Sequence, residues 1–88
     1  TDYASAATYY MNAGKDLNLA EEWMEKALSM MDNEPYWLLR QQSLIYAANG
    51  KTDKAISTAK ASLAAAQKAG NADYVKMNKD SLKEWGAM

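Results

Sequence analysis

Hydrophobic positions along this chain recur with the three- to four-residue spacing of amphipathic helices. The first segment carries Tyr3, Ala6, Ala7 and Tyr10, spaced i, i+3, i+4 and i+7. Similar stripes continue to the end of the chain, separated by short turns that contain Gly, Asn or Pro. The pattern therefore predicts an all-α protein.

Turn and capping signals divide the chain into five helices. Gly14 is expected to end the first, and Asn18 to cap the second with Glu21 in its first turn. Pro35 is tolerated in a first helical turn and starts the third. The predicted helices run over about residues 2–13, from Asn18 to the turn at Asn33, over about 34–48, from a cap at Thr52 or Asp53 to about Ala69, and over about 72–86.

The apolar stripes of these helices supply the predicted core. Trp and Met at such positions are expected to fill space between helices rather than to contact ligands. The predicted core positions after the first helix are Ala20, Trp23, Met24, Ala27, Leu28, Met31, Leu38, Leu39, Ile45, Tyr46, Ile56, Ala59, Leu63, Ala66, Tyr74, Met77, Leu82 and Trp85.

Part of this pattern repeats along the chain. The recurring positions are 35 residues apart: Ala20, Met24 and Ala27, then Ala55, Ala59 and Ser62. A period in the mid-thirties is typical of stacked helical hairpins, each of which buries its apolar face against a neighbour. We therefore expect one domain over residues 1–88, with antiparallel hairpins at about 2–33 and 34–69 and a capping helix at about 71–86.

These residues resemble the tetratricopeptide repeat. The positions that match the first helix of that repeat are Tyr3, Ala6, Ala7 and Tyr10 in one unit and Leu39, Gln42, Ser43 and Tyr46 in the next. Ala20, Met24 and Ala27, with their counterparts 35 residues later, match the second helix. The resemblance implies a right-handed α-α superhelix with a concave groove for extended peptides. The carboxylate clamp of that family is not reproduced, because the first helix offers Asn12 but no Lys.

A second stripe on the third helix is the candidate partner groove. It lies apart from the core face, and Trp and Arg often anchor interfaces. With the corresponding positions of the first helix, the candidate residues are Thr8, Met11, Asn12, Trp37, Arg40, Leu44 and Ala48. If they bind a partner, Trp37, Arg40 and Leu44 should be partly exposed and dispensable for folding. The alternative is contact with another domain of a parent protein or with a second copy.

Composition argues against catalysis and against bound cofactors. The chain has no Cys and no His, so it offers neither a disulfide nor a conventional zinc or haem site. Ser57 lies near Lys54 and Lys60 but has no evident oxyanion loop or activating base. The acidic group Asp16, Glu21, Glu22 and Glu25 is interpreted as a solvated helix surface. We expect no enzyme activity and no cofactor.

The charges are unevenly distributed although the net charge is only −1. Residues 1–44 hold three basic and seven acidic side chains, and residues 45–88 hold seven basic and four acidic, which gives −4 and +3. Acidic residues interrupt the lysines, and the chain has a single Arg, so a nucleic-acid partner is not expected. The two ends could meet between copies, although solvated surface is the simpler interpretation. No segment is apolar enough to cross a membrane.

A narrower resemblance concerns residues 49–56 and 68–78, which are similar to the C-terminal region of a bacterial family of unknown function. Those proteins look exported and carry a separate N-terminal domain, and only this resemblance points to an exported or periplasmic location. The chain also begins without Met, as expected of part of a longer protein. We expect a non-catalytic interaction or scaffold module with a protein or peptide partner. The alternatives are a structural or dimerisation domain and an auxiliary domain of an enzyme.

Overall fold

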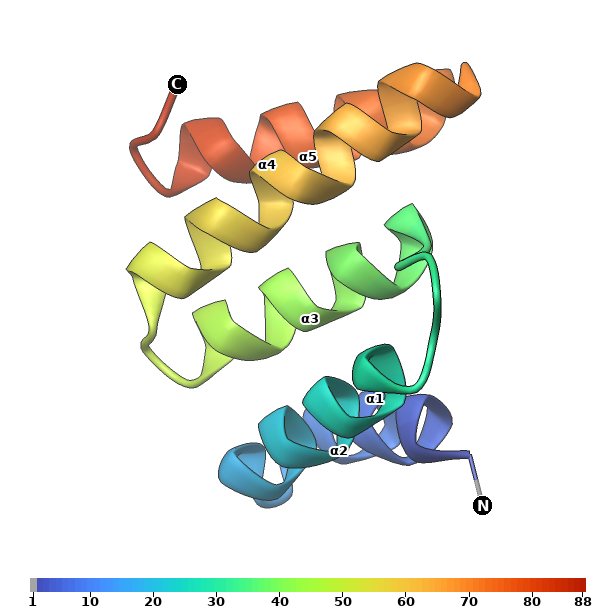
Figure 1. The fold of residues 1–88 in the computed structure, drawn as a ribbon. Helices are drawn as coiled ribbons and strands as arrows, with labels where there is room; N and C mark the ends of the chain where they lie inside the picture. Colours follow the sequence, from blue (N-terminus) through green and yellow to red (C-terminus); the bar gives the residue numbers. More distant parts are fainter. Residues whose placement is uncertain (1) are drawn as a thin grey trace.

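The computed structural model describes residues 2–88 and consists of five α-helices (Figure 1). They are α1 (Tyr3–Asn12), α2 (Leu17–Ser29), α3 (Tyr36–Ala48), α4 (Thr52–Ala69) and α5 (Ala72–Glu84). Consecutive helices run in opposite directions and are joined by short turns (Figure 1). The predicted all-α fold with five helices in hairpins is confirmed.

The helices form two layers. Each helix packs on its neighbours in sequence, and α3 also contacts α1 and α5. In contrast, α2 and α4 make no close backbone contact across the described residues. Within residues 2–88, α3 therefore contacts both α1 and α5 in one layer, whereas α2 and α4 lie apart in the other. This alternation is the arrangement that stacked hairpins require.

The residues that recur along the sequence are buried between the helices, and most of them are small. The recurring positions Ala20, Met24 and Ala27 of α2 are all buried, as are their counterparts 35 residues later in α4. The main apolar cluster combines these α2 residues with Ala4 and Ala7 of α1, Leu28 of α2, and Leu39 and Ile45 of α3. The sequence period therefore marks positions of α2 and α4 that are buried between helices.

Several helix boundaries differ from the prediction because other residues make the capping contacts. Asp16, not Asn18, caps α2, and its carboxylate accepts a hydrogen bond from the Leu19 N–H at 3.1 Å. The Asn18 amide oxygen instead accepts from Asn49 Nδ2 at 2.9 Å. Pro35 occupies the N-cap position of α3 in an extended conformation rather than its first turn.

Helix α4 begins at Thr52 without a capping side chain. The position before it is Lys51, so neither Thr52 nor Asp53 acts as the cap. The helix ends with a glycine C-cap, as helices often do, and Gly70 adopts a left-handed φ of 72° there. Asn71 then caps α5, accepting from the Tyr74 N–H at 3.1 Å.

Part of the predicted core is wrong. Met31 is 41% exposed, because α2 ends at Ser29 and the chain has already left the helix there. Met77 is also exposed, whereas its neighbour Asn78 is completely buried. Trp23, Leu38, Ile56, Leu63, Tyr74 and Trp85 are half-buried.

A buried hydrogen-bond network accompanies the apolar packing between α3, α4 and α5. Asn78 Nδ2 donates to Ser62 Oγ at 2.8 Å, and Ser62 Oγ donates to the Tyr36 carbonyl at 2.8 Å. Arg40 donates to Asn78 Oδ1 and to Ser81 Oγ, both at 3.2 Å. All buried side-chain N and O atoms of residues 2–88 have a partner. The network therefore fixes α5 without leaving an unpaired polar group.

A second polar cluster joins the two hairpins. Glu21 is buried, with 6% of its surface exposed, and pairs with Lys51 at 2.8 Å. Asn49 also donates to Glu21. The interpretation of Glu21 as part of a solvated acidic face is therefore wrong, because its carboxylate holds the α3–α4 turn against α2.

Candidate functional site: a groove beside helix α1

The clearest candidate site is a groove along α1. Its volume is about 560 Å³, and one wall is formed by Met31, near the start of the α2–α3 connection, and by the start of α3. Its lining residues are Asp2, Ala4, Ser5, Thr8, Tyr9, Asn12, Met31, Trp37 and Leu38. We call this surface the α1 groove. Most of its α1 residues are three or four positions apart, so they lie on one face of that helix.

Large apolar side chains are unusually exposed at the α1 groove. Tyr9, Met31 and Trp37 are 59%, 41% and 50% exposed. Only three other large hydrophobic side chains of the described chain reach comparable exposure: Met30, Met77 and Met88. Both exposed aromatic side chains of this set therefore lie at the same groove, which is typical of an interaction surface.

Aromatic contacts hold Trp37 at the edge of the groove. Its ring lies 5.0 Å from that of Tyr36 in an edge-to-face arrangement, and Tyr36 makes a similar contact with Tyr74 at 5.0 Å. Asn71 Nδ2 donates to the Tyr36 hydroxyl at 3.0 Å. The exposed indole is therefore supported by a row of rings that ends on α5, which limits the conformational entropy it would lose on binding.

A carboxylate lies among the polar residues of the groove. Asp2 caps α1 and accepts hydrogen bonds from the Ser5 hydroxyl at 2.7 Å and the Ser5 N–H at 3.1 Å. The Ser5 hydroxyl hydrogen bond is the main cause that holds the pKa of Asp2 below its ordinary value. Asp2 is exposed and remains anionic at neutral pH, so the groove can attract a basic group.

The structure brings together three of the seven predicted groove residues. Thr8 and Asn12 of α1 line the same groove as Trp37 of α3. Met11 does not line it, because its side chain is partly buried against the apolar core cluster. Leu44 is half-buried and Ala48 is exposed, and neither lines the groove.

Arg40 has a structural role that the sequence did not indicate. It is half-buried, and its guanidinium donates to Asn78 and Ser81 of α5 instead of turning towards the groove. Burial lowers the pKa of Arg40 from its ordinary value, while Tyr74 and Asp80 act in the opposite direction. The expectation that Arg40 is dispensable for folding is therefore not supported by its contacts.

Sequence reasoning missed the residues that give the groove its apolar character. Tyr9 falls outside the apolar stripe that contains Tyr10, and this position indicates an exposed aromatic side chain. The apolar spacing of α2 continues through Met31 and so predicts a core position there, but the helix ends at Ser29. An aromatic side chain off the core stripe is therefore the more useful sequence marker here.

Among residues 2–88, no group of three or more Cys, His, Asp or Glu side chains is placed to hold a metal ion. Within the same part of the chain, no helix combines the length and apolar character needed to cross a membrane.

Comparisons with known proteins identify no relative. No family model matches the chain, and neither curated proteins nor solved structures show significant similarity to it.

Proposed function

We propose that this chain is a non-catalytic protein-interaction module that binds an extended peptide segment in the α1 groove. The observation that carries the proposal is the clustering of Tyr9, Met31 and Trp37, three large exposed side chains, around one groove. Exposed aromatic side chains contribute much of the binding energy in protein interfaces. Here they are held in place by packed rings and a helix.

The lining residues define the chemistry of the peptide. An apolar side chain of the peptide would lie between Tyr9 and Trp37, where it gains contact with both rings. Thr8 and Asn12 can exchange hydrogen bonds with its backbone. A Lys or Arg of the peptide would lie near the anionic carboxylate of Asp2.

We also propose that the chain is a tetratricopeptide-like array of two hairpins and a capping helix with a right-handed superhelical sense. The support is the pattern of contacts: α1, α3 and α5 touch in series, whereas α2 and α4 do not among the described residues. The 35-residue recurrence of buried small residues gives the same register. In such arrays the layer of touching helices presents the binding surface.

Selection of peptides from a displayed random library on the immobilised chain tests the function. We expect enriched peptides to share an apolar anchor residue and a nearby Lys or Arg. Trp37→Ala should weaken the binding of an enriched peptide by about 30-fold, since interface anchors contribute about 2 kcal/mol or more. Fluorescence anisotropy of the labelled peptide measures the change.

Met30→Ala is the matched control, because Met30 is 65% exposed but does not line the groove. It should leave the affinity within about twofold, which is less than 0.5 kcal/mol. The proposal fails if no peptide is enriched, or if Trp37→Ala and Met30→Ala have equal effects on the enriched peptides.

A further inference from the structure

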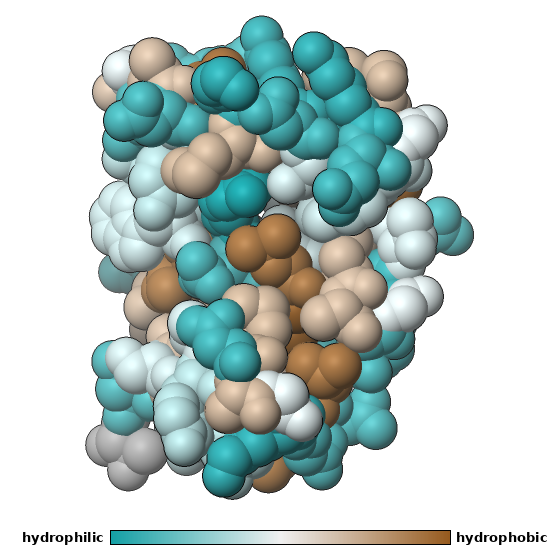
Figure 2. All heavy atoms as spheres, turned by 180° about the vertical axis from the view of Figure 1, so that it is seen from behind, coloured by the Kyte–Doolittle hydropathy of each residue, from teal (hydrophilic) through white to brown (hydrophobic). Residues whose placement is uncertain are grey.

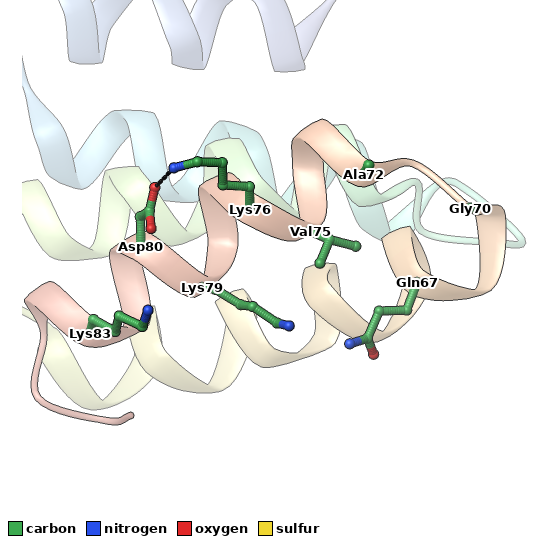
Figure 3. Close-up of a pocket in the computed structure, with 8 residues that line it drawn as sticks. All are labelled: Gln67, Gly70, Ala72, Val75, Lys76, Lys79, Asp80 and Lys83. Atoms are coloured by element: carbon green, nitrogen blue, oxygen red, sulfur yellow. Dashed lines mark hydrogen bonds and ion pairs between the residues drawn. The ribbon is translucent and has the colours of Figure 1, made fainter.

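A second groove lies at the other end of the molecule, between α5 and the end of α4. It has a volume of about 600 Å³ and is lined by Gln67, Gly70, Ala72, Val75, Lys76, Lys79, Asp80 and Lys83. Figure 3 shows Val75, Lys79 and Gln67 directed towards the same open space. Figure 2, a view from behind, shows mainly hydrophilic side chains over the upper part of the molecule and more apolar ones in the middle.

The lysines of this groove are not equivalent. Lys76 pairs with Asp80 at 2.8 Å, so its charge is already balanced. Lys79 and Lys83 make no ion pair within residues 2–88. With Val75 they are spaced i, i+4 and i+8 and so follow one face of α5. We call Val75, Lys79 and Lys83 the basic stripe.

A complementary acidic surface lies on α2. Glu22 and Glu25 are exposed and three residues apart, and Glu22 makes no ion pair in the part of the chain described by the structure. Side chains three or four residues apart on a helix are separated by about 5–6 Å. The two glutamates therefore have nearly the same spacing as Lys79 and Lys83.

One copy of the chain cannot bring these surfaces together. Helix α2 contacts α1 and α3, whereas α5 contacts α4 and α3, and no backbone contact joins α2 to α5 among the described residues. In Figure 1, α2 and α5 lie near opposite ends of the stacked helices. The acidic surplus of residues 1–44 and the basic surplus of residues 45–88 therefore correspond to separate regions of the molecule.

We propose that the basic stripe binds the Glu22–Glu25 surface of a second copy of this chain, with Val75 making the apolar contact. The contact joins two different surfaces, so a pair of copies still offers one free basic stripe and one free Glu22–Glu25 surface. Such a head-to-tail contact forms open chains or rings rather than a closed two-fold dimer. It uses a different surface from the α1 groove, so the two proposals can fail independently.

Sedimentation velocity of the 88-residue chain over a concentration series tests this contact. At an ionic strength of about 0.01 M, where charges act over about 30 Å, we expect species larger than a dimer to appear as the concentration rises. At about 1 M the range falls to about 3 Å, and the association constant should fall by about tenfold or more.

A charge exchange within one chain provides the sharper test. Lys79→Glu and Glu22→Lys should each weaken association by about tenfold or more, because each places like charges opposite one another. The double variant Lys79→Glu/Glu22→Lys should restore association to within about threefold. Lys60→Glu, on the exposed surface of α4, makes the same change in net charge as Lys79→Glu and should leave association unchanged.

Four results would overturn the proposal: a monomer at every concentration in low salt, a closed dimer, a double variant that stays as weak as its parents, or equal loss for Lys60→Glu. A chain that stays monomeric yet binds polyglutamate in a salt-dependent way would assign the stripe to another acidic partner. Circular dichroism should show unchanged helicity for all variants. Trp37→Ala should not change self-association.

Discussion

The two ends of the array are held together by different chemistry. Around α1 and α2 the buried side chains are apolar except for Glu21, with Met24 fully enclosed and Tyr10 packed edge-to-face on Trp23 at 4.7 Å. Between α4 and α5 the buried residues include Ser62 and Asn78, which hydrogen-bond to each other. Apolar burial is not directional, whereas hydrogen bonds are, so the first end gains stability and the last helix gains a defined position.

The α1 groove is supported by residues from both ends of the molecule. The Trp37 ring packs on Tyr36. Tyr36 in turn packs on Tyr74 and accepts a hydrogen bond from Asn71, and both of these residues belong to the end of the molecule around α5. The end around α4 and α5 therefore supports the Trp37 wall of the groove, whereas the other lining residues belong largely to the end around α1 and α2. The α1 groove depends on both types of packing.

The largest expected effect comes from the apolar end. Met24→Ala should lower the free energy of unfolding by about 2–5 kcal/mol, because it empties a fully buried site. Met30→Ala is the control, since Met30 is mostly exposed. Urea denaturation followed by circular dichroism measures both. Equal losses of stability for the two substitutions would contradict the assignment of Met24 to the core.

A smaller loss is expected at the polar end. Asn78→Ala removes an acceptor for Arg40 and a donor to Ser62, and should cost about 1–3 kcal/mol. Lys79→Ala, at the exposed neighbouring position, should change stability by less than about 0.5 kcal/mol. Urea denaturation compares the two. If Asn78→Ala were as well tolerated as Lys79→Ala, the hydrogen bonds would not be what positions α5.

A contact between α3 and α2, from Tyr46 to Glu25, is expected to depend on pH. Burial, and then the hydrogen bond from the Tyr46 hydroxyl to Glu25 at 2.6 Å, raise the pKa of Tyr46 above its ordinary value of 10.0. Because the folded pKa is the higher one, the stabilisation is complete below pH 10 and is lost as the pH rises towards the folded pKa.

Tyr46→Phe should therefore cost about 1 kcal/mol at neutral pH. The difference from the unmodified chain should shrink above about pH 10, where the unfolded tyrosine ionises. Urea denaturation at both pH values measures this change. Tyr9→Phe, at an exposed position, is the control and should show no such trend. A cost for Tyr46→Phe that is the same at both pH values would contradict a stabilising hydrogen bond from the Tyr46 hydroxyl to Glu25.

The smallest effect on stability is expected at the α1 groove. Trp37→Ala should change the free energy of unfolding by no more than about 0.5 kcal/mol, because the side chain is half exposed. Thermal denaturation followed by circular dichroism is sufficient to detect a larger loss. A cost close to that of Met24→Ala would show that Trp37 belongs to the core and not to a binding surface.

The sequence was informative where apolar periodicity decides the structure. The five helices and the buried positions of α2 and α4 follow from spacing and from small residues such as Ala20 and Ala55. Periodicity failed at α5, where it placed Met77 inside and overlooked Asn78. A buried asparagine is favourable only because Arg40 and Ser62 lie opposite it, and no local pattern reveals partners 38 and 16 residues away.

The candidate site was only partly predictable for the same reason. Thr8, Asn12 and Trp37 share a groove, as expected from their helical positions. Arg40 belongs to the same sequence stripe as Trp37 but turns to α5, where its hydrogen-bond acceptors lie. Met31 joins the groove only because α2 ends early. Tertiary partners, rather than spacing, decide these side chains.

Chemical-shift mapping tests the central claim, that the α1 groove binds peptides, most directly. The ¹⁵N-labelled chain is titrated with a peptide selected on it, and amide and indole signals are followed. We predict that the largest shifts fall on Ser5, Thr8, Tyr9, Asn12 and Met31, and on the indole N–H of Trp37. Largest shifts at Lys79 and Lys83 of α5, or changes spread evenly over all five helices, would contradict the account.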